Sequence, residues 1–156
     1  MRRTFSSRKG FTLIELLVVI SIIGLIATIS AVALKNARIK GRDARRLADM
    51  KQLHTAMELC LNANGGSYIT PACCTLGANN RAFQCSGGLL TSMPGIGQLK
   101  DPSNVAVTVG CDGNNTTPCE YTFLTPIATT AYTVRFFIEG PGGTSGNRTL
   151  TQAGIQ

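Results

Sequence analysis

The first third of the chain carries the strongest hydrophobic pattern. A short basic stretch ends at Gly10, and an almost uninterrupted apolar run follows over residues 11–34, holding one carboxylate, Glu15. At about 1.5 Å of helical rise per residue the run measures about 36 Å, enough to cross a hydrocarbon core of about 30 Å with some tilt. The small remainder of the chain could not surround a helix that is apolar on every face. The pattern therefore predicts a membrane-spanning helix and argues against a buried core helix.

A second periodicity follows this run. Residues 35–61 contain no proline, and their apolar side chains recur at steps of three and four, as in an amphipathic helix. Charged side chains such as Arg42 and Arg46 are expected to flank that face. Asn62-Ala63-Asn64-Gly65-Gly66 supplies a stop, with glycine suited to a left-handed cap. We predict one helix of about 52 residues, whose second half packs on a head domain through Leu47, Met50, Leu53, Met57 and Leu61, with Ala44, Ala48, Ala56 and Cys60 beside them.

Beyond the helix the composition shifts to Gly, Thr, Ser, Asn and Pro with short apolar runs, which is typical of short strands and long loops. The strongest predicted strand covers residues 131–139, and residues 120–125 and 105–109 are weaker candidates. Residues 148–151 are expected to pair back across a turn at 140–143. The sequence thus predicts an α+β fold, in which a small antiparallel sheet of three or four strands packs on the apolar stripe of the long helix.

The net charge of +7 lies mainly on the two flanks of the apolar run, and the distal domain is close to neutral. The basic stretch over residues 35–46 is therefore expected to lie at the membrane boundary. It could contact anionic lipid head groups or acidic groups on adjacent copies. No aromatic residue interleaves with these charges, so a stacking platform for DNA is absent and we do not expect DNA binding.

Six cysteines in a small, glycine-rich chain behind a membrane segment predict an oxidising location and disulfides, although the connectivity stays open. One expected pair, Cys111 with Cys119, would close a short loop around the turn at 112–115. A second would join the end of the helix to one member of an adjacent cysteine pair, leaving the other member for the sixth cysteine. The residues concerned are Cys60, Cys73, Cys74 and Cys85.

Catalytic and metal chemistry find little support in the residue pattern. The only histidine, His54, lies on the predicted helix, so the head lacks the parts of a Ser-His-Asp or Cys-His arrangement, and we expect no enzyme. No C-x-x-C spacing supports zinc. Asp112, Asn114 and Glu120 with neighbouring carbonyls could bind Ca²⁺, but the EF-hand pattern is incomplete and turn chemistry accounts for these residues. We expect no cofactor.

Two ordinary interpretations of the N-terminus leave Glu15 unexplained. A secretory signal peptide would use Ala31-Val32-Ala33 as its cleavage site, but its apolar region would be too long and would carry a carboxylate. A plain signal anchor explains the length, yet it leaves the acid unpaired at a cost of about 2.5–3.5 kcal/mol. Under a third interpretation the acid has a partner.

Gly10-Phe11-Thr12-Leu13-Ile14-Glu15, behind a basic leader and before an apolar tail, resembles the processing site of type IV prepilins and type II secretion pseudopilins. The resemblance implies that a membrane-embedded peptidase cuts between Gly10 and Phe11 on the cytoplasmic side and methylates the new amine of Phe11. It also implies that Glu15 pairs with the N-terminal amine of a neighbouring subunit. That pairing agrees with the rule that buried charges are tolerated when paired.

The same resemblance implies a leader over 1–10, a transmembrane and filament-core helix over 11–34, a stem over 35–64 and a head over 65–156. The subunit would start in the inner membrane, contact its lipids, and polymerise with itself and minor pilins into an extracellular or periplasmic filament. Prepilin peptidase, an assembly platform and an ATPase would be partners. A pseudopilin, or a membrane-anchored binding module, remains an alternative. Two features depart from expectation: more Lys and Arg follow the apolar run than precede it, against the positive-inside rule, and no proline lies near Val32.

Overall fold

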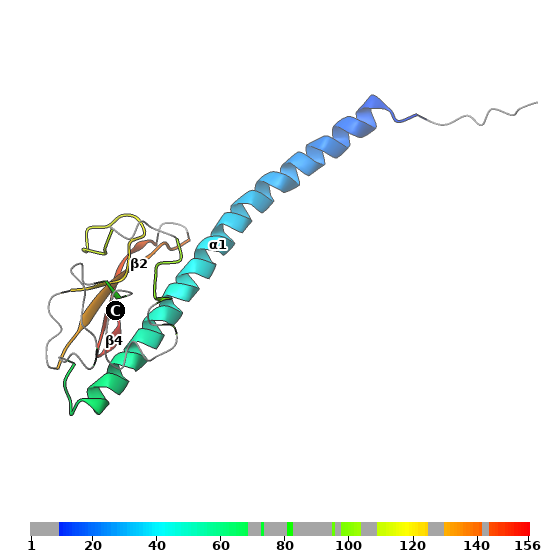
Figure 1. Ribbon diagram of the computed structural model, residues 1–156. Coiled ribbons are helices and arrows are strands. Elements are labelled where there is room, and N and C mark those ends of the chain that lie inside the picture. The colour runs from blue at the N-terminus through cyan, green and yellow to red at the C-terminus, as the bar shows by residue number, and fades with distance from the viewer. Residues whose placement is uncertain are drawn as a thin grey trace, which may run out of the picture. The chain divides into compact units, whose positions relative to one another are not determined.

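The computed structural model describes residues 10–68, 73, 81–82, 95, 98–103, 109–124, 130–141 and 144–156. The chain divides into two compact units, Met1–Ala37 and Arg38–Gln156. Over the described residues the elements follow the order α1, β1, β2, β3, β4 (Figure 1). The predicted α+β class, with one long N-terminal helix and a small antiparallel sheet, is confirmed.

Helix α1 covers Leu13–Ala63, which agrees with the prediction of a single helix without a proline break. Its end is fixed by a backbone cap. The amide of Gly66 donates to the carbonyl of Leu61 at 2.9 Å, and Gly65 adopts a left-handed φ of 64°. This is the six-to-one hydrogen bond of a Schellman motif, in which glycine avoids the steric cost that a Cβ would add.

The apolar part of α1 within Met1–Ala37 buries nothing against the chain. Leu13 is 88% exposed, and the large aliphatic side chains from there to Leu34 are about half exposed or more. Among the described residues, α1 is the helix that is long and apolar enough to span a membrane. This surface cannot remain in water as a contiguous apolar patch, so it needs lipid or protein around it.

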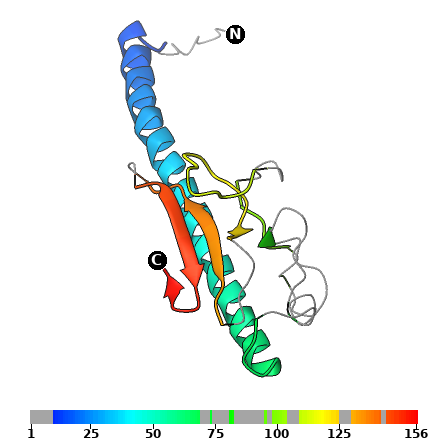
Figure 2. The ribbon, with the colours of Figure 1, turned by 90° about the vertical axis from the view of Figure 1, so that its left-hand side faces the viewer.

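The unit Arg38–Gln156 contains a four-stranded antiparallel sheet in the order β1-β2-β3-β4, visible beside the second half of α1 in Figure 2. Its strands are β1 (Thr122–Phe123), β2 (Thr133–Ile138), β3 (Gly146–Thr151) and β4 (Gly154–Ile155). β2 and β3 form the longest pairing, with Phe136 opposite Arg148. These two strands therefore form the centre of the head.

The two faces of β2 have different partners because side chains alternate along a strand. Val134 and Phe136 belong to the main core, together with Met50, Leu53 and Met57 of α1. On the alternate face, Phe137 packs with the bridged pair Cys111 and Cys119. The sheet is thus covered by α1 on one side and by the disulfide-closed loop on the other.

The prediction of an apolar stripe on the second half of α1 is correct toward the C-terminal end of the helix and wrong near residues 44–48. Leu47 is 37% exposed, and Ala44 and Ala48 are exposed as well. The buried positions at this level are Asp43 and Arg46. Arg46 lies four residues before Met50, and Asp43 lies three residues before Arg46. The same face of α1 therefore stays buried toward the start of the stem, but its side chains there are charged.

Three of the predicted strands correspond to observed ones. β2 falls within 131–139, β1 within 120–125, and β3 begins ahead of 148–151 and pairs back onto β2 as expected. The strand predicted over 105–109 lies outside the described residues except for Val109, which is not in a strand. β4 was not predicted, because two residues are too few to show a periodicity.

Candidate functional site

The N-terminal end of α1 is closed by a reciprocal cap between Thr12 and Glu15. The carboxylate Oε2 of Glu15 accepts hydrogen bonds from the backbone amide and the hydroxyl of Thr12, both at 2.8 Å. In return, the Glu15 amide donates to Thr12 Oγ1 at 3.3 Å. This arrangement is a capping box, which the spacing Thr-x-x-Glu could have revealed and which our sequence analysis missed.

The predicted processing site lies directly before this cap. Gly10 and Phe11 precede the first helical residue and are exposed, Phe11 by 85%. Of the leader predicted over residues 1–10, residues 1–9 lie outside the described residues. An exposed, non-helical peptide bond between Gly10 and Phe11 can be reached by another protein, whereas a bond inside a helix would first have to unwind.

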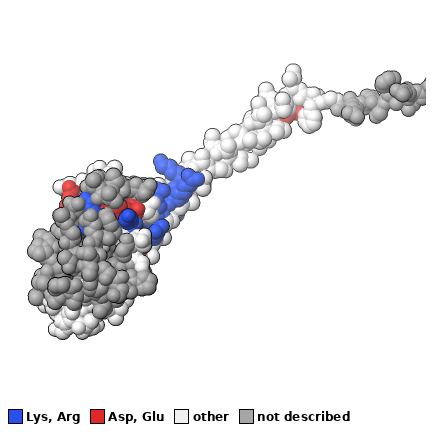
Figure 3. Space-filling view, in the orientation of Figure 1, with Lys and Arg blue, Asp and Glu red and all other residues white. Residues whose placement is uncertain are grey.

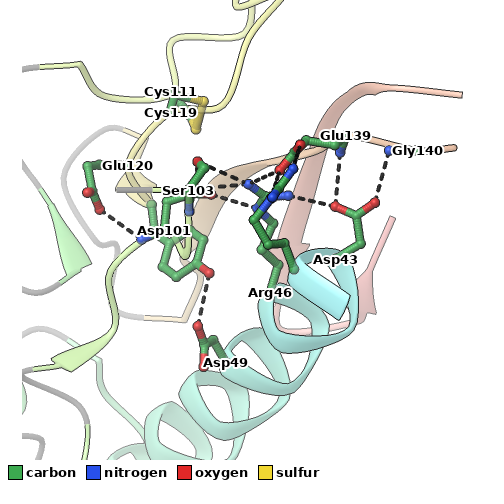
Figure 4. Close-up of polar contacts among 12 residues, drawn as sticks. Asp43, Arg46, Asp49, Asp101, Ser103, Cys111, Cys119, Glu120, Glu139 and Gly140 are labelled. Atoms are coloured by element: carbon green, nitrogen blue, oxygen red, sulfur yellow. Dashed lines mark hydrogen bonds and ion pairs between the residues drawn. A yellow bond between two sulfur atoms is a disulfide. The ribbon is translucent and has the colours of Figure 1, made fainter. Parts of the chain in front are cut away.

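Farther along α1, near the start of the stem, Arg46 forms the centre of a buried ion cluster (Figure 4). Its side chain is fully buried and joins two parts of the head to α1. Its Nε and Nη2 donate to the two oxygens of Asp101 at 2.7 and 2.9 Å. Nη1 reaches Asp43 at 2.6 Å and Nη2 reaches Glu139 at 2.8 Å. The bidentate pair with Asp101 uses the planar fork that only arginine provides.

Asp43 connects the cluster to the backbone after β2. Its two carboxylate oxygens accept the amides of Glu139 at 3.0 Å and Gly140 at 2.9 Å. Arg42 also pairs with Glu139. Ion pairs and hydrogen bonds of charged side chains therefore connect three segments that are distant in sequence. These are the start of the stem, the turn at Asp101 and the end of β2.

The pKa values reflect this pairing. Hydrogen bonds from Arg42, and then from Arg46, hold the pKa of Glu139 below its ordinary value, although burial opposes them. Burial by itself would lower the pKa of Arg46, but hydrogen bonds to Asp101 and the charge of that residue raise it above the usual arginine value. Glu139 and Arg46 are consequently expected to be ionised near neutral pH.

Nearby carboxyls behave in the opposite way. Burial raises the pKa of Glu120, whose side chain accepts the Asp101 amide at 3.2 Å. Burial also raises the pKa of Asp49, against the effect of a 2.9 Å hydrogen bond from the Tyr121 hydroxyl. These groups are held in place by neutral donors, which compensate a buried charge less well than an arginine does.

This cluster corrects the prediction for the basic stretch at 35–46. Arg46 was expected to flank the apolar face, but it is buried and paired, and Arg42 is half-buried and paired as well. Of the basic residues from Arg38 onward in that stretch, Arg38, Lys40 and Arg45 are exposed. The sequence offered one local signal, since Asp43 stands three positions before Arg46 and can pair with it on a helix.

The structure joins two of the predicted cysteine candidates at each of two places. Cys60, in the last turn of α1, is bonded to Cys73. Cys111 is bonded to Cys119, around a turn in which the Asn114 amide donates to Asp112 Oδ1 at 2.8 Å. Cys74 and Cys85 lie outside the described residues.

The residues considered for calcium or zinc are separated. Asp112 and Asn114 bond to each other in their turn, while Glu120 faces the Asp101 amide. His54 Nδ1 lies 2.7 Å from the hydroxyl of Tyr132. Within the part of the chain that the structure describes, no three His, Cys, Asp or Glu side chains come together as metal ligands would.

Comparison with known proteins points to the N-terminal half first. Residues 5–31 match the family model of the prokaryotic N-terminal methylation motif. A probable minor fimbrial protein of Dichelobacter nodosus is 29% identical over 112 residues, which are 68% of this chain and 70% of that protein. The type IV major fimbrial protein FimA of the same organism is 41% identical over 56 residues, 36% of each chain. No solved structure matches the chain.

An exposed membrane-length helix that bears the methylation motif and continues into an α+β head defines a pilin-like filament subunit. The motif and the fimbrial relatives together support the type IV pilin family for this chain.

Proposed function

We propose that the chain is the structural subunit of a type IV pilus-like filament, made as a membrane-inserted precursor and polymerised through α1. The single observation that supports this most is the apolar half of α1, which is exposed along its whole length. In a membrane, lipid covers that surface, and in a filament the helices of other copies replace the lipid. Heterologous contacts that do not close into a ring would extend such a filament without limit.

In the proposed assembly Glu15 has two successive partners. In the single chain it caps its own helix through Thr12. After cleavage between Gly10 and Phe11, a cationic amine on a neighbouring Phe11 would compete for the same carboxylate. A charge-assisted bond to an amine is stronger than the bonds to neutral donors that it replaces, so pairing between copies would be favoured in an apolar surrounding.

The maturation and assembly partners follow from this proposal. A prepilin peptidase would cleave after Gly10 and methylate Phe11, and an assembly platform with its ATPase would extract subunits from the inner membrane. The relatives are named as fimbrial proteins, which supports an extracellular pilus over a periplasmic pseudopilus. Minor pilins would share the filament.

Mass spectrometry of the N-terminus of filament material tests the maturation step. We expect a chain that begins at N-methylated Phe11. A chain that begins at Leu34 would indicate signal peptidase cleavage and refute the proposal, as would working filaments in which Gly10 is still joined to Phe11.

A pair of variants separates the capping role of Glu15 from its assembly role. Glu15→Gln retains an amide oxygen that can accept from Thr12, but it loses the charge that would bind an amine. We expect it to abolish filaments at normal precursor levels. The control Thr12→Val loses the capping hydroxyl, at a cost of about 1 kcal/mol to the helix end, but it should still polymerise. Filaments from Glu15→Gln with none from Thr12→Val would contradict the assigned role.

A further inference from the structure

The acidic side chains of this protein are almost all engaged within their own chain. The eight Asp and Glu residues all fall among the described residues. Outside the apolar segment, six of the acids are buried or half-buried and bonded to named partners: Asp43, Asp49, Glu58, Asp101, Glu120 and Glu139. The seventh acid outside the apolar segment, Asp112, is exposed. The head therefore offers few carboxylates to a neighbouring copy.

The basic side chains are distributed differently. Figure 3 shows Lys and Arg gathered along α1, with little acidic surface beside them on this face. Arg42 and Arg46 are satisfied by the ion cluster, and the charge of Arg45 acts on Asp49. Arg38 and Lys40 are exposed and have no partner among the described residues. We call these two residues the neck cations.

The position of the neck cations along α1 matches the depth of lipid head groups. At about 1.5 Å of rise per residue, Arg38 and Lys40 lie about 6 and 9 Å along the helix beyond Leu34, the last residue of the apolar run. The head-group layer extends about 5–8 Å beyond the hydrocarbon core. Long basic side chains can reach back toward that layer. Both cations therefore stand where phosphate groups would be in the precursor membrane.

We propose that Arg38 and Lys40 bind the phosphate groups of anionic phospholipids, and that this contact distinguishes the membrane-bound subunit from its filament form. The alternative partner, an acidic group on a second copy, is disfavoured because outside the apolar segment one exposed side-chain carboxylate per copy faces several exposed cations. An anionic lipid supplies the missing negative charge at the required depth. This inference rests on the membrane-inserted stage of the proposed function.

The consequence for assembly is specific. A subunit leaving the membrane exchanges lipid phosphates for water or for other copies, and the other copies carry the same positive necks. The lipid contact thus holds the subunit in the bilayer until the assembly machinery removes it. At about a factor of five in association per basic residue near an anionic surface, the two cations together would favour anionic lipid about 25-fold.

Lipid selectivity of the full chain tests the proposal. The chain is reconstituted, without polymerisation, in phosphatidylcholine vesicles, and the relative association of spin-labelled phosphatidylglycerol and phosphatidylcholine is measured by electron paramagnetic resonance. We expect a preference for phosphatidylglycerol that weakens at high salt. The double variant Arg38→Gln/Lys40→Gln should lower this preference for phosphatidylglycerol by up to about 25-fold. The matched control Lys51→Gln/Arg148→Gln removes two exposed cations elsewhere and should retain it.

Several results would overturn the proposal. These are the absence of a preference in the unaltered chain, an equal loss in the control, and a retained preference in the neck variant. A neck variant that loses binding to a DNA duplex while keeping its lipid preference would assign the neck cations to nucleic acid and would also refute the lipid contact. Circular dichroism confirms that both variants are folded. Because the chain is unpolymerised here, a lipid preference in a protein that never forms filaments would refute the proposed function alone.

Discussion

Replacing Arg46 with methionine tests whether the ion cluster holds the head onto α1. Methionine fills much of the same space but leaves three carboxylates without their shared cation. Glu139 would keep Arg42, and Asp43 would keep the two backbone amides that it accepts. Asp101 is affected most, because its side chain is fully buried and its remaining side-chain partner is the hydroxyl of Ser103.

The expected loss follows from that uncompensated charge. Removing one partner of a buried ion pair costs about 3–5 kcal/mol of unfolding free energy, and the 2.7 and 2.9 Å bidentate contact to Asp101 places this pair in that class. Adding Asp101→Asn to Arg46→Met should restore about 1–2 kcal/mol, since the buried charge is then gone. Arg46→Lys should fall between Arg46→Met and the unaltered chain because it cannot form the fork.

Urea unfolding of the full chain in detergent micelles, followed by near-ultraviolet circular dichroism of the tyrosines, measures these differences. Tyr121 reports on this region because its hydroxyl donates to Asp49 in the same stretch of α1. The control is Arg45→Met, at an exposed neighbouring position, which should change the unfolding free energy by less than about 0.5 kcal/mol. A loss below about 1 kcal/mol for Arg46→Met, or one equal to that of the control, would refute the reasoning.

Three other predictions concern the same head. Burial raises the pKa of Glu120, so its ionisation opposes folding, and Glu120→Gln should gain stability over the unaltered chain as pH rises from about 4 to about 7; a gain that grows toward acid pH instead would contradict this sign. Replacing Cys111 and Cys119 together by serine should cost about 2–4 kcal/mol in the same urea assay, because it opens the loop that covers the sheet; an unchanged midpoint would be the adverse result. Gly65→Ala should cost about 1 kcal/mol, because its φ of 64° suits glycine and open space around it excludes a steric clash as the cause; Gly146→Ala, with equal space and no left-handed φ, is the comparison.

The features that the sequence predicted well depend on short-range patterns. The apolar run, the continuous helix and its end near Gly65 each follow from periodicity or from residues adjacent in the chain. The strand at β2 also follows from a local pattern of alternation. The Thr12–Glu15 cap is equally local, and the spacing Thr-x-x-Glu encodes it in the sequence.

The failures concern positions whose environment is set by distant residues. An arginine on a predicted amphipathic helix is ordinarily solvated, so Arg46 was assigned to the flank of the apolar face. Its burial depends on Asp101, 55 positions away. The burial of the neighbouring Arg42 likewise depends on Glu139, 97 positions away. No periodicity within α1 carries information about either partner.

The sequence by itself determined which segment is long and apolar enough to span a membrane, where a processing site is predicted, and which class of fold follows. These depend on transfer free energies and on hydrogen bonds between near neighbours, which the order of residues encodes directly. The tertiary structure decided which charges remain available to other molecules. Only after folding do Arg42, Arg46 and Tyr121 become partners of carboxylates that are distant in sequence, because a buried charge must find a partner wherever the fold brings one within reach.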